Sequence, residues 1–229
     1  MELGRKPPLI GMTPEDVLAR QVAAALLTIG AVSFAPERPF TWASGLKAPI
    51  YCDNRLLISY PHVRRSIVEG FLQLLHQHRL EPEVIAGTAT AGIPHAAWLA
   101  DRLDLPLVYV RSQAKTHGQG RQIEGRLEAG QRVVLVEDLI STGGSSLTAV
   151  EALLAADGRV EAVLAIFSYG FPEAQERFAQ LGIPCYSLTN LTALLEVAQT
   201  HGLLTEETAQ LLVQWQQDPY SWSQLHSTP

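Results

Sequence analysis

The chain has 229 residues and a formal net charge of −6 at pH 7, and 47% of its residues are apolar against 17% charged. This composition provides for a sizeable core and excludes a disordered chain, and the acidic balance argues against binding of nucleic acid. No apolar run reaches the roughly 20 residues that span a bilayer, and residues 1–12 lack the apolar stretch of a signal peptide. The only cysteines, Cys52 and Cys185, are far apart, as expected for free thiols. We therefore expect a cytoplasmic protein with no membrane association.

The first part of the chain predicts a helix followed by a small subdomain. We expect residues 1–12 to form a flexible extension. A helix is predicted over residues 13–30, because Thr13 and Asp16 have the spacing of a capping box and apolar residues then recur at helical intervals. Residues 32–55 mix short β-type runs with prolines and glycine, which indicates a small subdomain of strands and turns.

From Pro61 onward, helical and strand patterns alternate. Apolar runs predict strands over 83–87, 105–110, 131–136, 160–167 and 184–188. Helical periodicity predicts helices over 61–75, 92–103, 146–156, 173–181, 191–201 and 206–217. This alternation predicts an α/β fold with an open parallel sheet and helices on both faces. We assign residues 13–200 to one domain and residues 201–229 to a C-terminal helical tail.

The most specific segment is Val133–Ser146, with the sequence VVLVEDLISTGGSS. A buried strand ends in two carboxylates and continues through a turn of small residues into a helix. The free backbone N–H groups of a helix start favour a phosphate, and the hydroxyls and glycines of residues 141–145 can close around it. Glu137 and Asp138 would repel a bare phosphate but suit ribose hydroxyls or a Mg²⁺ ion held by the substrate. The pattern therefore predicts a sugar-phosphate site.

A second informative stretch is the polar segment 111–126, with the sequence RSQAKTHGQGRQIEGR. Its four Lys and Arg residues minus one Glu give a local charge of +3 in an acidic chain. Three glycines interrupt it, and no apolar period anchors it. A charged loop with glycine hinges is typical of a lid, and its cations would stabilise negative charge that develops on a leaving group.

These segments resemble the orotate phosphoribosyltransferases, a group within the type I phosphoribosyltransferase family. The acidic strand end is similar to that family's signature for 5-phosphoribosyl-1-pyrophosphate (PRPP), and residues 111–118 match its R-x-x-x-K-x-H-G loop. The resemblance implies catalytic roles for Lys115, His117, Arg111 and Asp138. It implies that PRPP is bound by Arg111, Lys115, His117, Glu137, Asp138, Leu139, Ile140, Ser141, Thr142, Gly143, Gly144 and Ser145.

Residues 40–55 resemble the family's S-G-x-x-[SA]-P-x-Y region, which implies that 32–55 is a hood over the acceptor base. Tyr51 could stack on the base, and Arg55 could pair with a carboxylate. The resemblance implies that orotate is bound by Ser141, Tyr51, Arg55 and Lys47, and that pyrophosphate is bound by the loop of Thr88, Ala89 and Thr90. Three lysines that some family members carry are replaced by Ala43, Ala91 and Ser112.

The activity implied is transfer of the 5-phosphoribosyl group from PRPP to orotate, which gives orotidine 5′-monophosphate and pyrophosphate in UMP biosynthesis. Mg²⁺ is the implied cofactor, held by the substrate rather than by direct protein ligands, with Asp138 as a candidate contact. A homodimer that shares the lid loop across its interface is also implied.

Two alternatives remain open. A purine phosphoribosyltransferase should lack the R-x-x-x-K-x-H-G loop, and a PRPP-sensing transcriptional regulator should lack the lid cations and carry a basic appendage for DNA.

Overall fold

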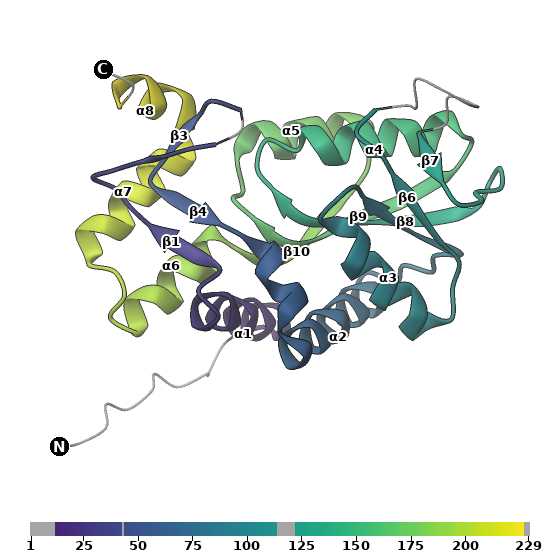
Figure 1. The fold of residues 1–229 in the computed structure, drawn as a ribbon, viewed down its shortest axis with the longest axis horizontal. Helices are drawn as coiled ribbons and strands as arrows, with labels where there is room; N and C mark the ends of the chain where they lie inside the picture. Colours follow the sequence, from purple (N-terminus) through teal and green to yellow (C-terminus); the bar gives the residue numbers. More distant parts are fainter. Residues whose placement is uncertain (1–11, 43, 114–121, 227–229) are drawn as a thin grey trace.

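The computed structural model describes residues 12–42, 44–113 and 122–226, so the predicted extension lies almost wholly outside the described residues. A central sheet stands between two helical layers, and short strands from the N-terminal part lie beside the last helices at one end of the molecule (Figure 1).

The N-terminal part consists of one helix and the hood. Helix α1 (Pro14–Thr28) begins with the predicted capping box, in which the Asp16 N–H donates to the Thr13 hydroxyl and the Thr13 N–H donates to the Asp16 carboxylate. The hood contains two antiparallel pairs, followed by a 3-10 helix. These are β1 (Val32–Phe34) with β4 (Ile50–Cys52), β2 (Phe40–Thr41) with β3 (Lys47–Ala48), and η1 (Asn54–Ser59).

Within the described residues, six strands form the central sheet. In spatial order they are β10 (Cys185–Asn190), β9 (Arg159–Ser168), β8 (Arg132–Ile140), β5 (Val84–Thr88), β6 (Leu107–Val110) and β7 (Ile123–Glu124). Neighbouring strands are parallel except β6 and β7. The predicted parallel sheet is therefore confirmed for five strands, and the two-residue β7 adds an antiparallel edge inside a segment expected to be loop.

Helices cover both faces of the sheet, as predicted. One layer contains α1, α2 (Pro61–Gln77), α3 (Gly92–Leu103) and α6 (Leu191–Thr200), and the other contains α4 (Gly144–Ala155) and α5 (Pro172–Leu181). Val134 and Val136 of β8 pack in the first core, whereas Val133 and Leu135 pack in the second. This alternation buries the strand on both faces. In the part of the chain that is described, no helix is long and apolar enough to cross a membrane.

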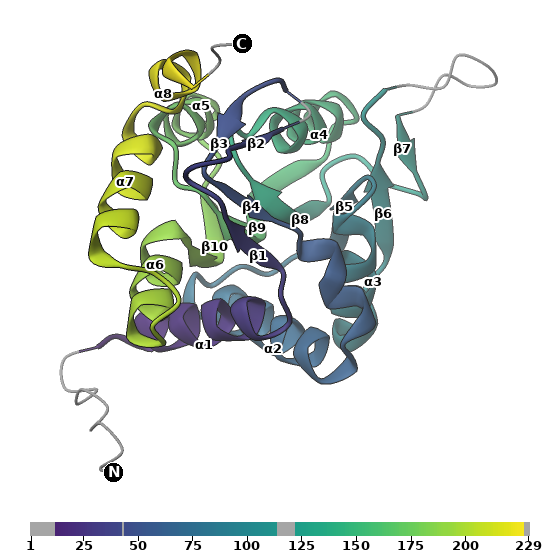
Figure 2. The same cartoon turned by 60° about the vertical axis from the view of Figure 1, so that its left-hand side comes forward.

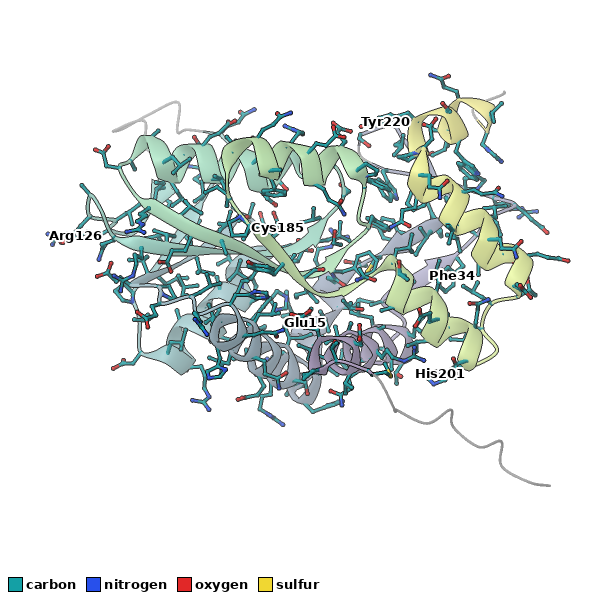
Figure 3. The ribbon with its side chains drawn as sticks, turned by 180° about the vertical axis from the view of Figure 1, so that it is seen from behind. Glu15, Phe34, Arg126, Cys185, His201 and Tyr220 are labelled. Carbon is teal, nitrogen blue, oxygen red and sulfur yellow. The ribbon has the colours of Figure 1, made fainter. Side chains whose placement is uncertain are left out.

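Two helices form the C-terminal tail. Helix α7 (Glu206–Gln217) matches the predicted helix 206–217, whereas α8 (Pro219–Leu225) is too short to show an apolar period. The tail lies beside the hood strands (Figure 2) and at the end of the molecule away from Arg126 (Figure 3). The boundary at residue 200 between domain and tail stays a prediction.

The order of the strands reverses between β5 and β8. Strand β6 lies on one side of β5, and β8, which follows later in the chain, lies on the other side. The loops that leave the carboxyl ends of β5 and β8 therefore diverge, and the crevice between them is where open α/β sheets bind ligands. The predicted pyrophosphate loop, 88–90, and the predicted sugar-phosphate segment, 137–145, both lie at this crevice.

A close backbone approach fixes the geometry of that crevice. A Cβ atom added at Gly92, the first residue of α3, would lie 2.5 Å from the carbonyl oxygen of Val136. Only glycine lets the start of α3 lie so close to the end of β8. The loop after β5 is thereby held next to the acidic end of β8.

Replacing Gly92 with alanine should therefore force α3 away from β8. We expect Gly92→Ala to lower the free energy of unfolding by about 1–3 kcal/mol, the usual cost of overpacking, in a urea titration of the purified protein. Gly144→Ala is the matched control, because an added Cβ there meets no atom within 4 Å. Equal stability of the two variants would contradict the steric argument.

Candidate active site

A cleft of about 380 Å³ lies between the hood and the carboxyl end of β8. Residues from the hood, the acidic strand end and the following loop share its wall. The lining residues are Trp42, Ser44, Tyr51, Cys52, Asp53, Arg55, Ala91, Glu137, Asp138, Leu139, Ser141, Ser145 and Tyr169. The structure thus brings together the predicted acidic pair, part of the predicted loop and three of the four predicted acceptor residues, Ser141, Tyr51 and Arg55.

The acidic pair lies inside β8 rather than after it. Pairing with β9 continues to Ile140, which is opposite Ser168. Glu137 is only 4% exposed, and its carboxylate accepts hydrogen bonds from the hydroxyls of Ser145 (3.1 Å) and Ser146 (2.9 Å). Glu137 is therefore hydrogen-bonded to the first turn of α4.

Burial shifts the ionisation of both acids. Burial raises the pKa of Glu137 above its ordinary value, and the nearby charge of Asp138 raises it further. Burial likewise raises the pKa of Asp138, while hydrogen bonds partly oppose the shift. The pair therefore retains a proton more readily than two exposed carboxyls, and hydroxyl donors or a cation in the cleft would favour its release.

A buried amide joins the hood to the acidic strand. Asn54 is 1% exposed, and its Nδ2 donates to the backbone carbonyl oxygen of Asp138 over 2.6 Å. Its Oδ1 accepts from the Cys52 thiol over 3.2 Å. Burial raises the pKa of Cys52 well above its usual range, so the thiol stays protonated and can donate. Asn54 thus fixes the separation between the two walls of the cleft.

The loop after β8 has the form expected of a phosphate site. Gly143 takes a left-handed conformation (φ 79°) and precedes α4, whose first turn has no side-chain cap. Free N–H groups at such a helix start attract an anion. The guanidinium of Arg177 on α5 donates to the carbonyl oxygen of Thr142 over 3.3 Å. This brings a positive charge next to the loop, which the sequence did not lead us to expect.

The second predicted loop follows β5. Thr88 is buried, and its hydroxyl has no hydrogen-bond partner among the described residues. The Ala89–Thr90 peptide bond is cis, and Ala91 lines the cleft. On α3 behind this loop, burial lowers the pKa of His95 to about 4, so the imidazole is neutral near pH 7.

The acceptor residues predicted in the hood occupy two different places. Tyr51 and Arg55 line the cleft, and the Arg55 guanidinium donates to the Tyr51 hydroxyl (3.1 Å) and to the Asp53 carboxylate (2.6 Å). The ammonium of Lys47 instead donates to the Thr41 hydroxyl across the β2–β3 hairpin (2.8 Å), and Lys47 does not line the cleft.

The phosphoribosyl transferase domain family matches residues 62–179, more than half of the chain. The orotate phosphoribosyltransferase of Bacillus caldolyticus is 53% identical over 205 residues, which cover 90% of this chain and 99% of that protein. The chain belongs to the orotate phosphoribosyltransferase family. Among solved structures, orotate phosphoribosyltransferase from Aeropyrum pernix is 30% identical with a TM-score of 0.66, over 79% of this chain and 99% of that one. UMP synthase of Leishmania donovani is 26% identical with a TM-score of 0.73, over 86% of this chain and 42% of that one.

Membership of this family confirms the predicted type I fold and enzyme class, but the predicted lid stays largely untested. Lys115 and His117 lie outside the described residues. Arg111 is 3.7 Å from the carboxylate of Glu124 and does not line the cleft. Its contribution to the site of an orotate phosphoribosyltransferase stays a prediction.

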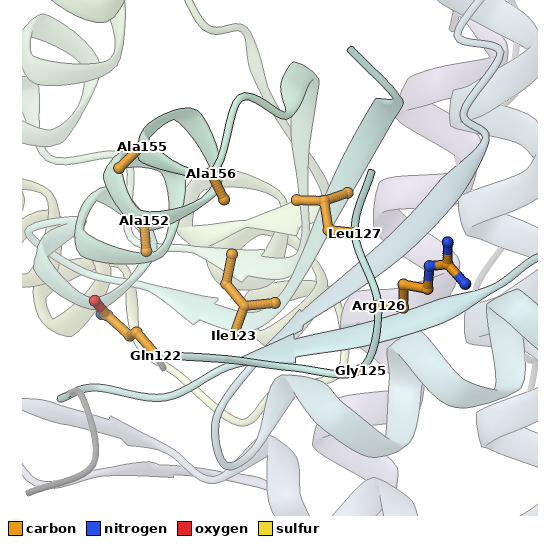
Figure 4. Close-up of a pocket in the computed structure, with 8 residues that line it drawn as sticks. All are labelled: Gln122, Ile123, Gly125, Arg126, Leu127, Ala152, Ala155 and Ala156. Carbon is orange, nitrogen blue, oxygen red and sulfur yellow. The ribbon is translucent and has the colours of Figure 1, made fainter. Parts of the chain in front are cut away.

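A larger cavity, of about 690 Å³, lies beside β7 and away from the acidic pair. Ile123 faces the alanines of α4 across it, whereas Arg126 is turned away from them (Figure 4). Among the described residues that line it, Arg126 alone is ionisable, and none carries a carboxylate or a hydroxyl. The smaller cleft has both groups and is therefore the candidate active site.

The raised pKa of Glu137 makes the stability of the free protein depend on pH. An acid whose pKa is higher in the folded state stabilises the fold below its unfolded pKa, and this contribution is lost as pH rises. Glu137→Gln removes the titration, so the variant should gain in melting temperature relative to the unmodified protein as pH rises from about 5 to 8. Parallel melting curves across that range would contradict this expectation, and the exposed Glu151→Gln on α4 serves as control.

Proposed function

We propose that this chain transfers the 5-phosphoribosyl group from PRPP to orotate, with release of orotidine 5′-monophosphate and pyrophosphate. The observation that carries the proposal is the pair Glu137 and Asp138 at the end of a buried strand, next to an uncapped helix start and opposite Tyr51 and Arg55. Such a site has acceptors for ribose hydroxyls, donors for a phosphate, and an aromatic ring with a cation for a planar carboxylate.

In this reaction, a ring nitrogen of orotate forms a bond to C1 of the ribose while the bond from C1 to the pyrophosphate oxygen breaks. Positive charge develops on the sugar and negative charge on the leaving group. No strong base is needed, so the protein contributes mainly by orientation and by electrostatic stabilisation. The two walls of the cleft, joined by Asn54, would hold acceptor and sugar in line.

On the sugar side, we assign Asp138 and Glu137 to the ribose hydroxyls and residues 139–145 to the 5-phosphate. Because Glu137 accepts from Ser145 and Ser146 in the free protein, binding of PRPP should exchange these hydroxyls for ribose hydroxyls. The Ser145 hydroxyl would then be available to the phosphate. The charge of Arg177 beside Thr142 supports the same assignment.

On the leaving-group side, we assign Thr88, Ala89 and Thr90, with Arg111, Lys115 and His117, to the pyrophosphate. Cations there would stabilise the charge that develops as the C1–O bond breaks, and His117 could protonate the departing oxygen near neutral pH. Tyr51, Arg55, Lys47 and Ser141 are assigned to orotate. For Lys47, this requires that the ammonium leave Thr41.

The cleft suits a Mg²⁺ ion that is held mainly by the substrate. Within the described residues, no group of three or more His, Cys, Asp or Glu side chains could hold a metal. Mg²⁺ commonly keeps several waters and binds through one or two carboxylates together with substrate phosphates, and Asp138 is a carboxylate of the cleft wall. When bound, the ion would neutralise part of the pyrophosphate charge.

We further propose a homodimer in which the lid loop is shared between subunits, in a cytoplasmic enzyme of UMP biosynthesis. The free thiols of Cys52 and Cys185 support a reducing compartment.

The two alternatives, a purine phosphoribosyltransferase and a PRPP-sensing transcriptional regulator, are not favoured. The R-x-x-x-K-x-H-G residues separate the chain from purine phosphoribosyltransferases, and the tail that packs on the hood carries no Lys or Arg with which a regulator would bind DNA.

The direct test is loss of orotate absorbance when purified protein is mixed with PRPP, Mg²⁺ and orotate. We expect metal-dependent loss, and we expect Lys115→Ala to slow it by about 100-fold or more, as for removal of one transition-state donor. Arg126→Ala, in the same charged segment, is the control. No loss of orotate despite PRPP binding in calorimetry would refute the acceptor assignment while leaving the sugar-phosphate site intact.

Arg55 should contribute specifically to acceptor binding. A hydrogen bond to a charged group contributes about 1.5–3 kcal/mol, so Arg55→Ala should raise KM for orotate by roughly 10- to 100-fold and leave KM for PRPP nearly unchanged. Arg102→Ala removes an arginine of similar exposure, also ion-paired, on α3 outside the cleft. An unchanged KM for orotate in Arg55→Ala would exclude this role.

A further inference from the structure

The C-terminal tail is hydrogen-bonded to the hood, although the two segments are far apart in the sequence. The backbone N–H of Lys47 in β3 donates to the hydroxyl of Ser223 in α8 over 2.9 Å. Ser223 is 8% exposed and Lys47 is half-buried, so this hydrogen bond is partly shielded from water. The β2–β3 hairpin therefore has a partner on the tail in addition to its own pairing between Phe40–Thr41 and Lys47–Ala48.

Aromatic rings extend the contact to the wall of the cleft. Trp215 of α7 is fully buried, and its ring meets those of Trp42 (5.7 Å between centroids) and Tyr169 (5.5 Å) edge-on. Trp42 and Tyr169 both line the cleft. The side chain of Gln216 also donates to the carbonyl oxygen of Tyr169. The tail thus stands directly behind two aromatic residues of the acceptor wall without lining the cleft itself.

The hairpin needs this support because it is small. Each of its strands has two residues, and a two-stranded hairpin is marginal in water without packing on another element. The indole N–H of Trp42 donates to the Ile50 carbonyl oxygen (3.3 Å) within the hood, and the ring also packs on Tyr169 (4.9 Å between centroids), which follows β9. The position of Trp42 relative to Asp138 therefore depends on Tyr169 and on Trp215, which contacts both rings.

We propose that the tail, α7 and α8, is a positioning element for the acceptor base, with Ser223 and Trp215 as positioning residues. They hold Trp42 and the hairpin against the cleft, so binding of the acceptor depends on side chains that do not touch it. This inference rests on the proposed function for the identity of the acceptor, and on the contacts of Ser223 and Trp215 for the mechanism.

A second hydrogen bond of the tail provides the control. The hydroxyl of Tyr220 in α8 donates to the carboxylate of Glu173 in α5 over 2.8 Å. It fastens the same helix to the main domain rather than to the hood. Tyr220→Phe should therefore leave the hairpin in place, whereas Ser223→Ala should release it.

The test compares these variants in the orotate assay. Loss of one hydrogen bond corresponds to roughly a two- to tenfold change, and we expect Ser223→Ala to raise KM for orotate by that factor without changing KM for PRPP. Trp215→Phe, which shrinks the ring behind Trp42, should act in the same direction. Tyr220→Phe should match the unmodified protein. An unchanged KM for orotate in Ser223→Ala, or an equal rise in Tyr220→Phe, would overturn the proposal.

Hydrogen exchange provides a readout that needs no reaction. We expect the amides of Lys47 and Ala48 to exchange faster in Ser223→Ala than in Tyr220→Phe, while amides of β8 stay protected. If the unmodified protein fails to convert orotate, the proposed function is wrong. Hydrogen exchange alone then tests whether the tail holds the hairpin in place. Unchanged exchange in the hairpin, or faster exchange throughout the protein, would then overturn its role.

Discussion

Two carboxylates at the end of a strand that is buried on both faces are the constraint on which the rest of the site depends. A buried charge without partners is costly, so such a strand end must be surrounded by donors. The hydroxyls of Ser145 and Ser146 serve Glu137, and the Asn54 amide binds the carbonyl oxygen of Asp138. The first turn of α4, whose hydroxyls satisfy Glu137, has no side-chain cap and stays open to a phosphate. The groups that pair with the polar end of the strand therefore also form the proposed sugar-phosphate site.

The strands of the sheet and the helices that cover it could be predicted, because apolar runs and helical periodicity are local features of the sequence. Residues 133–136 form a continuous apolar run, and the small residues after Ile140 predict a turn before a helix, which begins at Gly144, two residues before the predicted start. The end of β8 was harder to predict, because apolarity stops at Glu137 while hydrogen bonding to β9 continues to Ile140. Helix α8 was missed because seven residues cannot show a helical period.

The supporting residues of the site could not be predicted from the sequence. Asn54 acts on a residue 84 positions away, and Arg177 acts on one 35 positions away. Their own surroundings show only a polar residue after a short strand and a charged residue on an amphipathic helix. In the hood, alternation along β4 does explain why Tyr51 is exposed between buried Ile50 and Cys52. The cross-strand contact of Lys47 with Thr41 depends on the pairing of β2 with β3, which the sequence does not display.

The distribution of the site along the chain has a consequence for how the protein is made. In the proposed site, the two loops assigned to phosphates and the acidic strand end lie between residues 88 and 145, whereas the proposed acceptor wall draws on residues 42–55 and on a support that begins at Glu206. During synthesis, the sugar-binding half has all of its residues outside the ribosome long before the acceptor half does. Ser223 lies 78 positions after Ser145, so the acceptor half is completed well after the sugar-binding half.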